Sequence, residues 1–208
     1  MSIRLITFDI FGTVLDWRRG LARLSDREFD RVIDRQAELE AGPFRSYTEI
    51  VAQSLIDVAR FDAVSAARHG AEAGFWPLFP DSTEALRKLR TLAPCAAITN
   101  SDRSHGEDVQ SQLGFRLDGW ICAEEVRAYK PDERMWQATS KKLGVPFGRD
   151  WWHVSAYADY DLETARKLGL TCVFVERPHS RPGAADFAVR DLAELAALVA
   201  AKADAPPA

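Results

Sequence analysis

Short apolar runs alternate with helix-like segments over most of this chain, and this alternation constrains the fold more than any other feature. Nearly continuous apolar runs of strand length occupy residues 3–8, 95–99, 151–155 and 171–175. The segments between the later runs have helical periodicity. Uninterrupted apolar strands are typical of parallel sheets that are covered by helices on both faces. The sequence therefore predicts an α/β fold with a Rossmann-like parallel sheet core flanked by helices.

One long segment departs from this alternation. The part of the chain that follows the first strand is charged, rich in Ala, Leu and Arg, and contains no good strand candidate. A capping-box pattern at Ser25 opens a long helix that runs through Glu40. We therefore expect a helical cap domain, residues 17–78, inserted after the first strand of a core domain formed by residues 1–16 and 79–208.

Composition narrows the class of partner and the compartment. The 208 residues include 31 acidic and 27 basic ones, so the net charge of −4 gives no general attraction to nucleic acid or to an anionic membrane. The three cysteines match no metal motif and lie in apolar runs, as buried thiols of a reducing compartment do. A signal-peptide layout and a bilayer-spanning apolar run are both missing from the sequence. We expect a cytoplasmic protein with neither nucleic-acid nor membrane partners.

The first apolar run ends in a carboxylate and a tight turn. Residues 8–13 read Phe-Asp-Ile-Phe-Gly-Thr, which places Asp9 at the end of a predicted strand and Gly12 in the turn. A carboxylate in this position can attack carbon or phosphorus and form an ester or an acyl-phosphate. Glycine permits the sharp turn and a close approach of the backbone to a substrate. For this segment by itself, an incidental Asp before a turn remains the alternative.

Three later segments follow in a specific order. Residues 96–101 contain a strand that ends in Thr followed by Asn; residues 128–132 contain Lys-Pro-Asp; and residues 153–162 end in Asp-Leu. Together with residues 8–13, these segments resemble the four motifs of the haloacid dehalogenase superfamily. The branch that they resemble is that of the 2-haloacid dehalogenases (type II, L-2-haloacid dehalogenase-like), and the resemblance covers about residues 3 to 200.

The resemblance implies a role for each polar residue of these motifs. Asp9 would be the covalent nucleophile, and Thr99 would donate a hydrogen bond to its carboxylate or to the bound substrate. Lys130 would keep Asp9 ionised and oriented, and Asp161 would orient or deprotonate a water molecule. Without this context, Lys130 would be an exposed lysine before a helix, and Asp161 a helix N-cap.

The same resemblance implies a substrate pocket. Arg35 lies in a segment similar to the cap segment that supplies an arginine to the halide site of these dehalogenases, although an arginine on a charged helix is usually solvated. Backbone N–H groups near Asn100 would bind a substrate carboxylate. Trp136 stands where the dehalogenases usually carry Tyr. The residues expected to bind substrate are Ile10, Phe11, Arg35, Asn100, Trp136, Ser155 and Tyr157.

Departures from the common motif distinguish a dehalogenase from a phosphatase. Phosphatases of the superfamily carry a second Asp two residues after the nucleophile, where this chain has Phe11. Their early acidic metal ligand in the fourth motif corresponds here to Ala156 or Tyr157, and neither side chain binds a hard cation as a carboxylate does. A halide leaving group is a weak base and needs no general acid. We therefore expect no bound metal and no cofactor.

The sequence thus predicts a hydrolase that converts short 2-haloalkanoic acids into 2-hydroxyalkanoic acids through an ester on Asp9. Its expected partners are a halogenated carboxylic acid and halide, and the family resemblance suggests a possible homodimer. A small-molecule phosphatase acting through a phosphoaspartate remains an alternative. A non-catalytic binding relative is a second alternative, which the intact Asp9, Thr99 and Lys130 disfavour.

Overall fold

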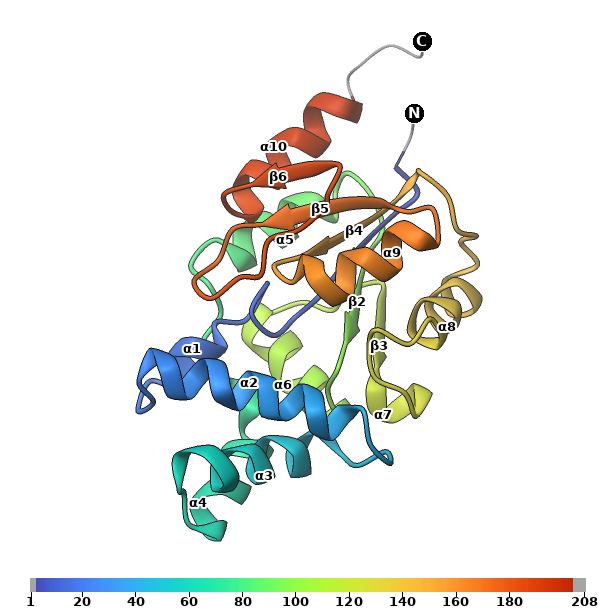
Figure 1. Ribbon diagram of the computed structural model, residues 1–208. Coiled ribbons are helices and arrows are strands. Elements are labelled where there is room, and N and C mark those ends of the chain that lie inside the picture. The colour runs from blue at the N-terminus through green and yellow to red at the C-terminus, as the bar shows by residue number, and fades with distance from the viewer. Residues whose placement is uncertain (1–2, 204–208) are drawn as a thin grey trace.

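The computed structural model describes residues 3–203, and a six-stranded parallel sheet forms the centre of this part of the chain (Figure 1). The strand order is β3-β2-β1-β4-β5-β6, and every neighbouring pair is parallel. β1 is therefore an inner strand, with β2 and β4 on its two sides. The predicted parallel α/β fold is confirmed. The strands are β1 (Leu5–Phe8), β2 (Cys95–Thr99), β3 (Gly119–Cys122), β4 (Trp151–Ser155), β5 (Thr171–Val175) and β6 (Phe187–Val189).

Burial of both faces explains the nearly continuous apolar runs. Every residue of β1, β2, β4 and β5 is buried. Alternate residues of each strand belong to two separate apolar clusters, one on each face: Ile6 and Phe8 belong to one, and Leu5 to the other. In the edge strand β6, which has three residues, only the last one is buried.

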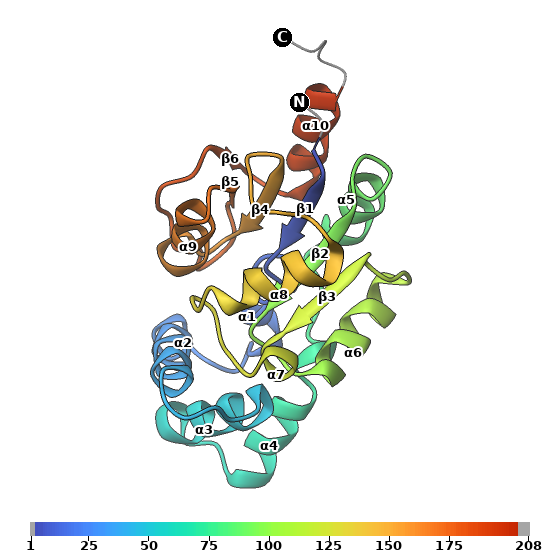
Figure 2. The same cartoon turned by 90° about the vertical axis from the view of Figure 1, so that its right-hand side faces the viewer.

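Helices of the core cover both faces of the sheet (Figure 2). Residues of α5, α6 and α10 belong to the larger apolar cluster, and residues of α8 and α9 to the smaller one. These helices are α5 (Ser82–Leu89), α6 (Arg103–Leu113), the short α7 (Ala123–Val126), α8 (Arg134–Leu143), α9 (Glu163–Lys167) and α10 (Leu192–Ala203). A π-helical turn, η2 (Ala158–Leu162), precedes α9. Within residues 3–203, no helix is long and apolar enough to cross a membrane.

The helices between β1 and α5 form a separate layer. α2, α3 and α4 pack together, away from the sheet (Figures 1 and 2). The capping box at the start of α2 is present, because Ser25 and Glu28 each accept a hydrogen bond from the other residue's backbone N–H. The elements of this layer are α1 (Trp17–Gly20), α2 (Asp26–Glu40), α3 (Tyr47–Ala59), α4 (Ala63–Ala71) and the 3₁₀ turn η1 (Ala73–Phe75).

A buried carboxylate of the core holds the first turn of α3. Asp102, just before α6, accepts hydrogen bonds from the backbone N–H groups of Tyr47 (2.8 Å) and Thr48 (2.9 Å) and from the Thr48 hydroxyl (2.8 Å). The N–H groups of a first helical turn have no partner within their own helix, so this carboxylate supplies one. The contact fixes α3 over the carboxyl end of β2.

Candidate active site

Asp9 lies at the carboxyl end of β1, and a different donor holds each of its carboxylate oxygens. Its Oδ1 accepts a hydrogen bond from Lys130 Nζ at 2.8 Å, and its Oδ2 accepts one from Thr13 Oγ1 at 2.7 Å. The Thr13 oxygen itself accepts from the Ala156 N–H at 2.9 Å, so the Thr13 proton is directed toward Asp9. Only 3% of Asp9 is exposed. The turn after β1 therefore orients the carboxylate that the sequence marks as the nucleophile.

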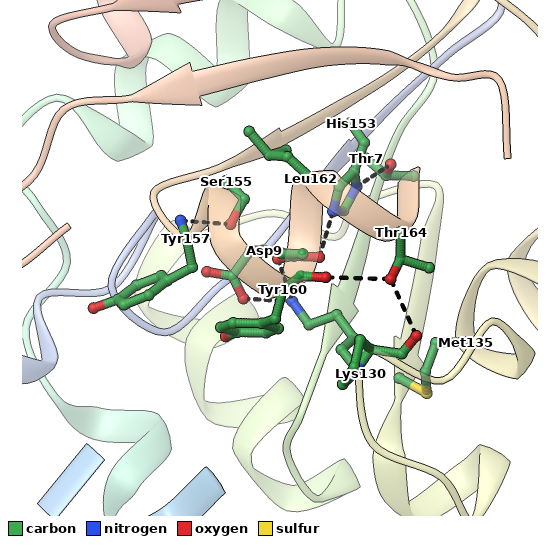
Figure 3. A network of polar contacts seen from close by, with 12 residues as sticks. Thr7, Asp9, Lys130, Met135, His153, Ser155, Tyr157, Tyr160, Leu162 and Thr164 are labelled. Atoms are coloured by element: carbon green, nitrogen blue, oxygen red, sulfur yellow. Dashed lines mark hydrogen bonds and ion pairs between the residues drawn. The ribbon is translucent and has the colours of Figure 1, made fainter. Parts of the chain in front are cut away.

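Lys130 bridges Asp9 and Asp161, and Figure 3 shows Lys130 beside Asp9. Its Nζ lies 2.7 Å from Asp161 Oδ2. Burial lowers the pKa of Lys130, but Asp161 and Asp9 together raise that pKa above its usual value. Burial raises the pKa of Asp161, whereas Lys130 and His153 lower it to about 2. Lys130 and Asp161 are therefore charged at neutral pH, as a buried ion pair must be to offset its desolvation.

The pKa of the Asp9 carboxyl group shifts in the opposite direction to that of Asp161. Burial raises the pKa of Asp9 above its usual value, and the adjacent Lys130 and the Thr13 hydroxyl only partly oppose this effect. A carboxylate that has lost its water is a stronger nucleophile than a hydrated one, provided that a cation keeps it ionised. Lys130 is the cation that contacts it.

Asn100 fixes the loop that carries Lys130. The side-chain oxygen of Asn100 accepts a hydrogen bond from the Lys130 N–H at 2.7 Å, and its nitrogen lies 3.2 Å from the Lys130 carbonyl. The same nitrogen donates to Glu40 Oε2 at 3.0 Å. Asn100 was expected to contribute backbone N–H groups to a substrate; the structure adds that its side chain links β2, the Lys130 loop and α2.

A cavity of about 690 Å³ opens above Asp9, between α2 and the loops of the core. Among the predicted site residues, Asp9, Phe11, Thr99, Asn100 and Lys130 line it. A volume of this size is typical of pockets that bind small molecules. Lining residues that the sequence did not indicate include Trp17, Ile33, Gln36, Glu40, Tyr129, Tyr160 and Arg181.

Phe11 occupies the position that is an acid in phosphatases of the superfamily, and it forms part of an aromatic wall. Its ring packs edge-on against Tyr47 at 5.2 Å and Trp76 at 5.9 Å between ring centroids. The Tyr47 hydroxyl donates to Gln36 Oε1 at 3.0 Å. The predicted apolar wall at this position is present in the structure.

Glu40 adds a carboxyl group that no sequence motif singles out. It is the last residue of α2 and lies in the pocket wall, where Asn100 donates to it. Burial raises the pKa of Glu40 to about 8, against the opposing effects of Asn100 and Lys130. At neutral pH this side chain is therefore mostly protonated and can donate a hydrogen bond into the pocket.

The structure corrects the expectation for Arg35. Its guanidinium binds Asp57 and Glu38, each at 2.8 Å, and Arg35 is not among the pocket-lining residues. The positions of α2 that line the pocket are 33, 36, 37 and 40, which recur at helical spacing on one face. Position 35 lies off this stripe, so its side chain is directed toward α3.

The structure corrects one of the two hydrogen bonds expected from Thr99, the one to Asp9; a hydrogen bond from Thr99 to a bound substrate stays a prediction. The Thr99 hydroxyl lies 3.3 Å from Ser101 Oγ, and the threonine that donates to Asp9 is Thr13. Thr99 still lines the pocket, at the end of β2. Thr13 belongs to the first motif, but its place in the tight turn does not by itself indicate a hydrogen bond to Asp9.

Four predicted substrate-binding residues lie behind the pocket instead of in its wall. Ile10, Trp136, Ser155 and Tyr157 are all buried and do not line the cavity. Trp136, on α8, packs edge-on against His153 at 5.5 Å. These side chains shape the site from beneath, so their expected contact with substrate is corrected.

Tyr157 also explains Gly12. The φ angle of Gly12 is +90°, and a Cβ added there would lie 2.6 Å from the Tyr157 ring and 2.9 Å from Trp17 Nε1. Glycine is needed both for this backbone conformation and for the close packing. The close approach predicted at Gly12 is therefore to a core aromatic ring rather than to a substrate.

The carboxylates around Asp9 do not fit a Mg²⁺ site. In the described range 3–203, no group of three or more His, Cys, Asp or Glu side chains is placed to hold a metal ion. The Lys130 ammonium occupies the space between Asp9 and Asp161, and Phe11 and Ala156 supply no carboxylate. Mg²⁺ requires near-octahedral oxygen coordination, which this set of side chains does not supply.

Comparisons with known proteins agree with this site. Residues 3–169 match the family model of the haloacid dehalogenase-like hydrolases, and the chain belongs to that family. Over 205 residues it is 28% identical to (S)-2-haloacid dehalogenase 4A of Burkholderia cepacia, covering 87% of this chain and 86% of that relative.

Solved structures have the same fold. The chain resembles the crystal structure of the L-2-haloacid dehalogenase PA0810 with a TM-score of 0.81 and 25% identity, over 95% of this chain and 100% of that one. It also resembles the L-2-haloacid dehalogenase of Xanthobacter autotrophicus with chloropropionic acid covalently bound, with a TM-score of 0.81 and 17% identity, over 96% and 99% of the two chains.

Proposed function

We propose that the protein is a hydrolytic dehalogenase that converts short 2-haloalkanoic acids into 2-hydroxyalkanoic acids. The observation that carries the proposal is the Lys130-bound carboxylate of Asp9, which faces an aromatic pocket and has Phe11 where a phosphatase has its leaving-group acid. The named activity of the Burkholderia relative supports the same conclusion.

In the first step, an Asp9 carboxylate oxygen attacks the halogen-bearing carbon of the substrate in line with the carbon–halogen bond. The new carbon–oxygen bond makes an ester, and halide leaves with the bonding electrons. Arg35 is directed away from the pocket, so we assign the reception of the halide to the aromatic wall around Phe11, where ring edges carry partial positive charge.

In the second step, water attacks the carbonyl carbon of the Asp9 ester and releases the hydroxy acid. Asp161 would orient this water, because Lys130 holds it next to Asp9. Lys130 would also stabilise the negative charge that develops on the ester oxygen. Neither step requires a cofactor.

We further propose that residues 17–78 act as a cap domain on a core formed by residues 1–16 and 79–208. The support is that α2 and α3 supply one wall of the pocket and the loops after the strands supply the other. A cap of this kind excludes water from the displacement step. The cytoplasmic location and the homodimer stay predictions.

The test is halide release from the two enantiomers of 2-chloropropionate, with added EDTA or Mg²⁺, beside a panel of phosphate esters. We expect halide release that EDTA does not abolish, and no release by the matched variant Asp9→Asn. In a single turnover in heavy-oxygen water, the first product should carry ordinary oxygen from Asp9. Mg²⁺-dependent phosphate release without halide release would contradict the proposed function.

A further inference from the structure

His153 lies directly beneath the candidate active site, in the middle of β4, and is fully buried. Its register partners are Thr7 on β1 and Cys172 on β5, so the three side chains lie on one face of the sheet. A buried imidazole is costly unless its ring nitrogens are hydrogen-bonded. Both nitrogens of His153 are in such contacts: one with Thr7, as Figure 3 shows, and the other with Asp161.

The Asp161 carboxylate fixes the direction of one of these hydrogen bonds: its oxygens only accept, so His153 Nε2 carries a proton and donates. The Trp151 indole, which can only donate, lies 2.8 Å from Thr7 Oγ1. The Thr7 hydroxyl can then give its own proton to His153 Nδ1 at 2.8 Å or to the Trp152 carbonyl at 3.4 Å, and the shorter contact is the stronger hydrogen bond. If the Thr7 proton goes to Trp152, the Thr7 oxygen can accept from Nδ1–H, so in both cases Thr7 is a hydrogen-bond partner of His153 Nδ1.

The proton on the other nitrogen of the imidazole, Nε2, is directed at Asp161. His153 Nε2 lies 2.8 Å from Asp161 Oδ1 and donates to it. The second oxygen of Asp161 accepts from Lys130 Nζ at 2.7 Å. Each Asp161 oxygen thus has its own donor, from opposite directions, and the plane of the carboxylate is fixed.

The remaining groups around His153 do not replace this contact. The Trp136 ring packs against the imidazole edge-on, and the Cys172 sulfur lies 3.4 Å from the Leu162 carbonyl. The hydrogen bonds that connect His153 with Asp9 run through Asp161 and Lys130. If His153 were lost, both oxygens of Asp161 would be free to turn toward Lys130, and the carboxylate would lose its orientation toward Asp9.

We propose that His153 is a positioning residue that orients the Asp161 carboxylate for hydrolysis of the ester on Asp9. This inference rests on the proposed dehalogenase function. In the step concerned, a water proton passes to Asp161 as the water oxygen bonds to the Asp9 carbonyl carbon. The bond to the hydroxy-acid oxygen then breaks, and that oxygen takes the proton back from Asp161. Asp9 returns as a carboxylic acid, which loses its proton to solvent.

The two chemical steps should therefore respond differently to loss of His153. Formation of the ester uses Asp9 and Lys130, whereas hydrolysis also uses the oriented Asp161. His153→Phe removes the donor and keeps an aromatic ring, and His153→Gln keeps an N–H donor near the position of Nε2. Trp136→Phe is the matched packing control, because Trp136 contacts the same imidazole without a hydrogen bond to it.

The experiment measures the halide burst and the steady rate of each variant on 2-chloropropionate. For His153→Phe we expect one halide per enzyme in the burst, a steady rate lower by about 100-fold, and an ester on the Asp9 peptide seen by mass spectrometry. His153→Gln should recover part of the steady rate, and Trp136→Phe should show no ester. A wild-type steady rate in His153→Phe, or an equal loss in both steps with no ester, overturns the proposal.

A second measurement is independent of any substrate. Nitrogen NMR of the wild-type imidazoles, with the His153 signal identified from its absence in His153→Phe, should show a proton on Nε2. A ring without a proton on Nε2 overturns the proposal even in an active dehalogenase. If the wild-type protein releases no halide, the dehalogenase function fails, and the tautomer alone decides whether His153 donates to Asp161.

Discussion

Asn100 holds Lys130 by its main chain: the amide oxygen accepts from the Lys130 N–H at 2.7 Å, and the amide nitrogen lies 3.2 Å from the Lys130 carbonyl. The Asn100 side chain thereby pairs with both main-chain polar groups of Lys130, as the backbone of a neighbouring strand would. The position of the charge opposite Asp9 depends on this pair.

Asn100→Ala should therefore reduce kcat by about 100-fold, because a small misplacement of Lys130 weakens its contact with Asp9. It should also destabilise the protein by ~1–3 kcal/mol, because the Lys130 N–H loses its partner. Steady-state kinetics and urea unfolding measure the two effects. Unchanged kcat with reduced stability would limit Asn100 to a structural role.

Thr13 and Thr99 should differ sharply when each is replaced by Val. Thr13→Val removes the donor to Asp9 Oδ2 and the acceptor of the Ala156 N–H, so we expect kcat to fall by about 10- to 100-fold. Thr99→Val removes only a 3.3 Å contact with Ser101 and should change kcat by less than about threefold. The reverse order in parallel assays would restore the role first expected of Thr99.

Arg35→Ala should leave kcat/KM on 2-chloropropionate nearly unchanged. The guanidinium binds Asp57 and Glu38 in partly exposed ion pairs, and such pairs contribute ~0–1 kcal/mol to stability. Substrate kinetics and thermal unfolding of the variant test this. A loss of kcat/KM of tenfold or more would mean that α2 rotates to bring Arg35 to the pocket when substrate binds.

Glu40 should make stability fall with rising pH. Its folded pKa of about 8 lies above the ordinary value of 4.5, so between these pH values the folded state binds more protons than the unfolded state. The contribution of Glu40 to the free energy of unfolding is complete below about pH 4.5 and is lost as pH rises through about 8. Urea unfolding of wild type and Glu40→Gln over this range measures it.

The variant Glu40→Gln also tests whether the Glu40 carboxyl group affects substrate binding in the pocket. Once Glu40 ionises, it opposes an anionic substrate, so KM for 2-chloropropionate should rise above about pH 8 in the wild type. Glu40→Gln cannot ionise and should show a flatter KM profile. Identical profiles for both proteins would place the Glu40 carboxyl outside the substrate's reach.

The sheet could be predicted because its inner strands are buried on both faces. The runs at residues 95–99, 151–155 and 171–175 begin and end where β2, β4 and β5 do. β6 was not predicted, because its apolar run has only three residues and two of them remain at least partly exposed at the edge of the sheet. The capping box of α2 could be predicted because its two residues, Ser25 and Glu28, have the fixed spacing of three positions that defines the motif.

The site was predictable only in part. Asp9 and Lys130 lie in short motifs whose spacing marks them, and the structure brings them together. Arg35 was misplaced because α2 is charged on several faces, so the sequence does not reveal which face meets the pocket. The link between Thr7 and His153 depends on the register of β1 against β4, which no local pattern specifies.

The two edges of the helical layer are held to the core with unequal strength. Three hydrogen bonds to the buried Asp102 hold α3, whereas the ion pair Arg181–Asp34 that ties α2 to the core involves an exposed aspartate. Salt screens exposed pairs and leaves buried ones largely intact. The rates at which substrate enters and product leaves past α2 should therefore rise with ionic strength. The α3 side of the helical layer should stay attached to the core.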